Sequence, residues 1–157
     1  MEPRHIRPAV ERRLGLLRVY ESRAAATTTQ RLRTLARDPI RAVRLWTARN
    51  PNTPPDALAT LLQDEDHSVQ WNALLHPRTP PEALELLARQ ETEEAKASRR
   101  PGLTVNREYV AHHPNTPPRL RDELIAAGVC RACPDHPCTT FRVFMRAADR
   151  SSSVQDG

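Results

Sequence analysis

Apolar residues recur along the chain at the spacing of short helices, in groups that prolines separate. Three groups share a stripe of leucine and alanine: Leu58, Leu61, Leu62; Leu84, Leu87, Ala88; and Leu120, Leu124, Ala127. Spacings of three and four residues place side chains on one face of an α-helix. The stripes predict helices at residues 54–63, 80–89 and 117–127. A shorter helix is predicted before each one, at residues 41–49, 68–75 and 107–112.

One turn motif joins the two helices of each pair. It reads Asn50-Pro51-Asn52-Thr53-Pro54-Pro55 in the first copy, and it returns at residues 76–81 and 113–118 with histidine in the first position. The copies are 26 and then 37 residues apart, so 11 residues are inserted between the second and the third. A proline disfavours the helical conformation in the residue before it, which ends the first helix. We expect Thr53 to cap the second helix, with Asp56 completing a capping box.

The predicted helices are too short to be stable alone, because isolated helices need about 12–15 residues. Their apolar faces must therefore be buried against neighbouring repeats, as in a solenoid. A degraded fourth copy is predicted near residues 27–38. The sequence thus predicts an all-α fold, a short α-solenoid of helix–turn–helix repeats.

The chain divides into four parts in this interpretation. Residues 1–26 form an N-terminal capping helix, whose inward face is expected to hold Leu14, Leu17 and Tyr20. Residues 27–128 form the repeat array, with an insertion loop at about 90–102. Residues 129–150 form a cysteine-containing loop and a C-terminal cap, and residues 151–157 form a flexible tail.

The repeated string Val-x-x-x-Val/Thr/Ala-Ala/Leu-x-Asn/His-Pro-x-Thr-Pro-Pro-x-x-Leu resembles the variant leucine-rich repeat. The resemblance covers about residues 27–127. It implies a right-handed superhelix without strands, in which α-helices alternate with 3₁₀ helices. More distant HEAT-like solenoids are the alternative.

The composition bears on where the protein works. No apolar run approaches the roughly 18 residues of a membrane span, and no signal-peptide apolar segment follows the start. The three cysteines fall within nine positions, unlike a disulfide framework spread over a secreted domain. We therefore expect a cytoplasmic protein without a membrane partner.

The positive charge is concentrated in the first third of the chain. Residues 1–50 hold 12 arginines and 4 acidic residues, a net charge of +8, whereas the remainder carries −3. Four arginines fall near helical spacing and form the candidate binding surface: Arg33, Arg37, Arg41 and Arg44. They suggest a nucleic-acid-binding solenoid as the alternative function. A solvated helical face is the favoured interpretation, because no aromatic stacking platform accompanies them.

The cysteines suggest a second alternative, a metal-bearing accessory protein. Cys130, Cys133, His136 and Cys138 supply soft ligands of the kind that zinc or an iron–sulfur cluster requires. Some variant leucine-rich repeat proteins carry an iron–sulfur module, so the resemblance strengthens this alternative. The spacing is not that of a standard zinc site. We therefore favour a loop without a bound cofactor.

The remaining polar residues do not predict catalysis. The sequence lacks a glycine-rich phosphate loop, His-Glu-x-x-His and Gly-x-Ser-x-Gly. His76 and His113 fill the position of Asn50 and are expected to form hydrogen bonds within the turn. The favoured function is a non-catalytic scaffold that binds a protein or peptide rather than a small molecule.

Overall fold

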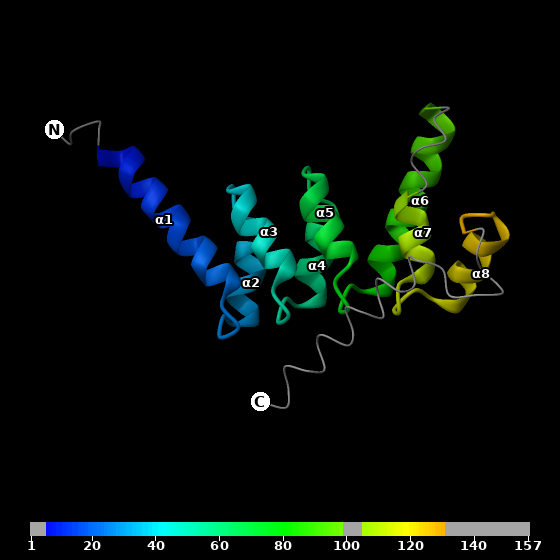
Figure 1. The fold of residues 1–157 in the computed structure, drawn as a ribbon, viewed down its shortest axis with the longest axis horizontal. Coiled ribbons are helices and arrows are strands. Elements are labelled where there is room, and N and C mark those ends of the chain that lie inside the picture. Colours follow the sequence, from blue (N-terminus) through cyan, green and yellow to red (C-terminus); the bar gives the residue numbers. More distant parts are fainter. Residues whose placement is uncertain (1–5, 99–104, 131–157) are drawn as a thin grey trace. The chain divides into compact units, whose positions relative to one another are not determined.

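The computed structural model describes residues 6–98 and 105–130, and the regular structure in these ranges is entirely α-helical (Figure 1). The described helices are α1 (Ile6–Arg23), α2 (Thr29–Leu35), α3 (Arg41–Arg49), α4 (Pro55–Leu61), α5 (His67–Leu74), α6 (Pro81–Ser98), α7 (Val105–His112) and α8 (Pro118–Ala126). The predicted all-α fold of packed helical repeats is confirmed. No 3₁₀ helix occurs within the described ranges, so the alternation that the resemblance implies is absent there. None of the described helices combines the length and apolarity needed to cross a membrane.

The chain divides into two compact units, Met1–Arg78 and Thr79–Gly157. In the first unit α3 packs between α1 and α5, while α2 and α4 pack against each other and against this row. Two layers result, and Figure 1 shows α1, α3 and α5 side by side. In the second unit α7 packs against both α6 and α8.

Two positions of the repeat are buried in copy after copy. Leu32, Leu58 and Leu84 lie 26 residues apart and are fully buried. Ala48, Leu74 and Ala111, which each stand three residues before the motif proline, are buried as well. The first two predicted apolar stripes therefore form the core, whereas in the third stripe only Leu124 is buried and Ala127 is exposed. The expected degraded copy contributes α2 through Leu32.

The helix boundaries follow the predictions closely, but the role of the motif threonine differs. The expected helix at 41–49 has those bounds as α3, whereas α4 begins at Pro55 and has Pro54 as its N-cap, without a side-chain bond. Thr53 lies one residue too early to cap α4. Its hydroxyl instead donates to the Thr47 carbonyl oxygen at 2.6 Å, an acceptor at the end of α3. The predicted capping box is therefore wrong.

Two other expectations change in the structure. Helix α6 continues through Ser98, so the first part of the predicted insertion loop is helical, as its run of glutamate, alanine and lysine favours. In α1 the expected inward face is wrong, because Leu17 and Tyr20 are 59% and 68% exposed. The buried face carries Gly15 and Ser22. A β-carbon at Gly15 would lie 2.6 Å from Cδ1 of Ile40, which shows how closely α1 approaches this part of the chain.

Candidate functional site

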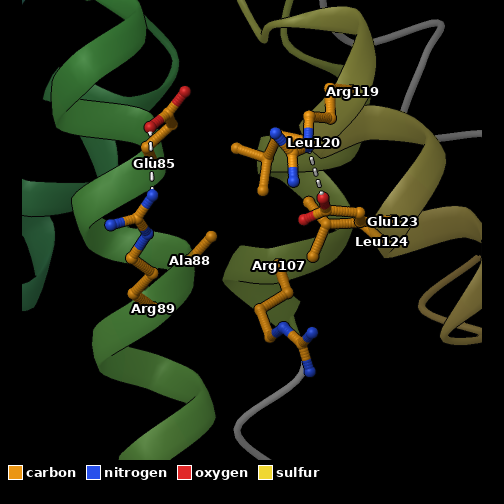
Figure 2. Close-up of a pocket in the computed structure, with 8 residues that line it drawn as sticks. All are labelled: Glu85, Ala88, Arg89, Arg107, Arg119, Leu120, Glu123 and Leu124. Atoms are coloured by element: carbon orange, nitrogen blue, oxygen red, sulfur yellow. Dashed lines mark hydrogen bonds and ion pairs between the residues drawn. The ribbon is translucent and has the colours of Figure 1, made fainter.

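A pocket of about 580 Å³ lies among α6, α7 and α8 of the second unit (Figure 2). Its lining combines three arginines, two glutamates and three apolar residues: Arg89, Arg107, Arg119, Glu85, Glu123, Ala88, Leu120 and Leu124. In Figure 2, Ala88 from α6 and Leu120 from α8 point toward one another across the pocket. A lining that combines apolar side chains with a few charged groups is typical of binding pockets.

The charged rim of the pocket is only loosely fixed. Arg89 and Glu85 pair at 3.4 Å, and Arg119 and Glu123 pair at 3.1 Å, each one turn apart on its own helix. The side chain of Arg119 is 91% exposed. Exposed ion pairs of this kind contribute about 0–1 kcal/mol. The rim side chains can therefore rearrange around a bound partner at little cost.

Arg107 differs from the other arginines of the pocket. Its Nε atom is buried and has no hydrogen-bond partner among the described residues. A buried donor without a partner costs about 1–3 kcal/mol. Because this Nε atom is covered by the surrounding protein, it is out of reach of a ligand, and Arg107 contributes to the pocket through the positive charge of its guanidinium group. The sequence shows no pattern that singles out this residue.

The arginines predicted as a binding surface lie in the first unit, where they bond to later parts of the same unit. Nε of Arg33 lies 2.6 Å from Asp56, and Nε of Arg41 lies 2.5 Å from Asp66. Arg37 donates to the hydroxyl of Thr60 at 3.2 Å. These bonds link each arginine to a residue 23 to 25 positions later, which is about one repeat.

Arg44, the fourth predicted residue, is buried in a polar network. Its Nε and Nη2 atoms donate to the two carboxylate oxygens of Asp64 at 2.6 and 3.1 Å. Its Nη1 atom donates to the carbonyl oxygens of Asp38 and Pro39. The side chains of Arg44 and Asp64 are only 11% and 6% exposed. Arg44 thus ties the α2–α3 connection to the α4–α5 connection.

The acidic turn at residues 64–66 shapes the start of α5. Asp66 is the N-cap, and its Oδ1 accepts from the backbone N–H groups of Ser68 and Val69. The Arg41 guanidinium, followed by these backbone bonds, lowers the pKa of Asp66. Asp66 therefore fixes the start of α5.

The turn histidines bond as the sequence predicts. Nδ1 of His76 accepts from the Arg78 N–H, and Nδ1 of His113 accepts from the Asn115 N–H, each at 3.1 Å. In the first copy, Oδ1 of Asn50 accepts from Asn52 in the same way at 2.9 Å. Burial lowers the pKa of His76, which favours the neutral ring that this bond requires.

The described residues contain only one of the four predicted metal ligands. Cys130 is buried at 5% exposure, and Cys133, His136 and Cys138 lie outside the described residues. Cys130 lies beside Glu108 and His112 of α7, and the three possible ligand atoms are within 4.8 Å of one another. The sequence interpretation missed both α7 residues, although their separation of four positions was a usable signal.

Residues 41–66 match the profile of the leucine-rich repeat variant family. The matched segment runs from the first residue of α3 to the N-cap of α5, one full period of the repeat. No curated protein and no solved structure gives a significant match.

Proposed function

We propose that this chain, whose residues 41–66 form a leucine-rich repeat variant, is a non-catalytic scaffold that binds a protein or peptide partner. The observation that carries the proposal is the α6–α7–α8 pocket, with Leu120 and three arginines in its lining. Repeat proteins present such surfaces on a framework whose stability comes from stacking. In this chain the framework consists of the buried leucines that recur every 26 residues and of the hydrogen-bonded turns between helices.

The pocket chemistry defines the segment that fits it. An apolar side chain would cover Leu120 and the buried Leu124. A carboxylate beside it would be attracted by the net positive charge of the lining, which carries one more arginine than glutamates. The expected ligand is therefore a peptide segment with an acidic residue next to an apolar one.

The bonds of the Arg-rich half favour a protein partner over a nucleic acid. Arg33 and Arg41 each face an aspartate, and Arg44 is buried against Asp64. A phosphate would have to displace these carboxylates from the guanidinium groups. Affinity for nucleic acid depends on the number of phosphates that cations neutralise, so these pairings lower it.

The outer face of α1 is a second apolar surface and supplies a matched control. Leu16 is 57% exposed there, close to the values for Leu17 and Tyr20. A large exposed apolar patch can also bind proteins. A substitution on α1 changes the exposed apolar area of the first unit, and no residue of α1 is part of the pocket lining.

A peptide-display selection against the whole chain tests the proposal. We expect enriched peptides to carry an acidic residue next to an apolar one. A selected peptide should bind Leu120→Glu at least about tenfold more weakly, a loss of about 1.4 kcal/mol. Arg107→Gln should weaken binding of acidic peptides more than that of their amide analogues. The control Leu17→Glu should bind as the unchanged protein does.

Two results would contradict the pocket as the binding site. One is selection of peptides whose affinity is unchanged in Leu120→Glu. The other is loss of binding in Leu17→Glu with full binding in Leu120→Glu, which would transfer the site to α1. Circular dichroism of each variant shows whether the helices are intact.

A further inference from the structure

We propose that Glu108, His112 and Cys130 form a binding site for one zinc ion in the second unit. One carboxylate oxygen, one imidazole nitrogen and the thiol sulfur all lie within 4.8 Å of one another. The site differs from the C-x2-C-x2-H-x-C pattern of the sequence, because two of its three ligands come from α7. It is also separate in function from the peptide pocket.

The fold brings the three side chains together by two local features. Glu108 and His112 are four residues apart on α7, so they lie on one face of the helix, one turn apart. Cys130 follows the end of α8, where Gly128 adopts a φ of 73°. The Gly128 N–H donates to the carbonyl of Ile125 and the Val129 N–H donates to that of Leu124.

This pair of bonds is a Schellman motif, which ends the helix and reverses the chain direction. Glycine is suited to the left-handed conformation at this position, because a β-carbon is strained there. The reversal places Cys130 against α7 instead of in solvent, and the residue is buried. The thiol is thus delivered to the two α7 side chains by backbone geometry.

The two α7 ligands occupy repeat positions at which the first two copies have other residue types. Counted from the motif proline, Glu108 stands where Leu45 and Trp71 stand in the first two copies. By the same count His112 stands where Arg49 and Leu75 stand. A carboxylate has thus replaced two large apolar residues in the copy that is followed by a cysteine. This exchange supplies the oxygen ligand that a metal site in the third copy requires.

The donor set suits zinc more than other common ions. Zinc binds sulfur at about 2.3 Å and nitrogen or oxygen at about 2.0–2.2 Å, so tetrahedral ligands are roughly 3.2–3.8 Å apart. The three ligand atoms lie within 4.8 Å of one another, so side-chain rotations that move each atom by about 1 Å would bring them to these distances. Calcium and magnesium prefer oxygen ligands only. Three protein ligands leave the fourth position open.

The burial of the histidine is consistent with this role. His112 is only 7% exposed, so its ring lies inside the fold, where its ligand nitrogen is within 4.8 Å of the Glu108 and Cys130 ligand atoms. A neutral imidazole is the form that binds metal. On binding, the Cys130 thiol would release its proton to solvent and bind as the thiolate.

Titration of the metal-free, reduced, full-length chain with Co²⁺ tests the site directly. We expect one equivalent to produce a sulfur-to-cobalt charge-transfer band and the visible bands of a tetrahedral site, and one equivalent of Zn²⁺ to remove them. Cys130→Ser should abolish the charge-transfer band. Glu108→Gln and His112→Gln should weaken Co²⁺ binding at least about tenfold.

His67→Gln is the matched control, since His67 is an exposed histidine at the start of α5 in the other unit. It should leave the titration unchanged. Absence of the charge-transfer band in the unchanged protein would overturn the proposal, even if every variant failed to fold. Unaltered affinity in Glu108→Gln and His112→Gln would overturn it as well, because the metal would then be held elsewhere.

Discussion

Nε2 of His76 lies 3.1 Å from the carbonyl oxygen of Asn50, the residue that fills the same position one repeat earlier. Because Nδ1 of His76 accepts from Arg78, the ring proton is on Nε2, which donates to Asn50. Asn50 repeats the arrangement, since its Nδ2 donates to the carbonyl oxygen of Ala24, also 26 residues earlier, at 3.0 Å. Asparagine and histidine are thus equivalent at this position, because each side chain has one acceptor atom that bonds within its own turn and one donor atom that bonds to the preceding repeat.

This equivalence predicts the effect of substitutions at His76. His76→Asn preserves both bonds and should lower the free energy of unfolding by less than about 1 kcal/mol. His76→Ala removes both and leaves a cavity, so we expect a loss of about 2–4 kcal/mol. Urea unfolding at pH 8 measures both. As a control, His67→Ala, at an exposed histidine, should change the free energy of unfolding by less than about 0.5 kcal/mol. Equal losses of stability in His76→Asn and His76→Ala would contradict the bonding scheme.

The same histidine makes stability depend on pH. Burial lowers its pKa below the ordinary value of 6.5, so between the folded and unfolded pKa values the unfolded chain binds more protons. The contribution of His76 is complete above about pH 6.5 and is lost as the pH falls toward the folded pKa, by at most about 1.4 kcal/mol per pH unit. His112 acts with the same sign. Urea midpoints at pH 8.0 and 5.5 should therefore differ less in His76→Asn than in the unchanged protein.

Two arginines of similar sequence context should differ strongly in their effect on stability. Arg44→Met leaves the buried carboxylate of Asp64 without its partner, which we expect to cost about 3–5 kcal/mol. Arg41→Met removes a bond of an arginine that is 53% exposed, which should cost at most about 1 kcal/mol. Urea unfolding at neutral pH compares them. The double variant Arg44→Met/Asp64→Leu should recover much of the stability that Arg44→Met loses. If its loss instead equals the sum of the losses in Arg44→Met and in the single variant Asp64→Leu, the two residues are not coupled.

The approach of α1 at Gly15 predicts a coupling with Ile40. Gly15→Ala should gain up to about 1 kcal/mol of helix stability, but the new β-carbon meets Cδ1 of Ile40. Ile40→Val removes that atom. We therefore expect Gly15→Ala to be more favourable, by about 0.5–1 kcal/mol, in the Ile40→Val background. A thermal double-mutant cycle checks this, and additive effects would place α1 farther from Ile40.

The repeat helices could be predicted from the sequence because three physical signals coincide. Leucine spacing defined the stripe, proline ended the first helix, and the repeat supplied the register, so α3 was predicted with its observed bounds. The inward face of α1 was not predictable in this way. Helical periodicity identifies an apolar stripe but does not reveal that a close helix approach selects Gly15 and Ser22 instead.

The site was less predictable than the fold because it depends on side chains far apart in the sequence. Glu108 and Cys130 meet only because a left-handed Gly128 reverses the chain after α8. Arg107 became notable only through the burial of its Nε atom. Arg44 was predicted as a surface residue, and its burial against Asp64 follows from a bond that joins neighbouring repeats.

The preference for a protein partner over a nucleic acid can be tested by one comparison of affinities. A selected peptide and a short DNA duplex are titrated separately into the full-length chain at 50 and 200 mM salt. We predict that the peptide binds more tightly at both concentrations and loses little affinity, while DNA binding stays in the non-specific range of about 10⁻⁴–10⁻⁶ M at physiological salt. Tighter DNA binding that falls steeply with salt and is lost in Arg33→Gln/Arg41→Gln would contradict the proposed function.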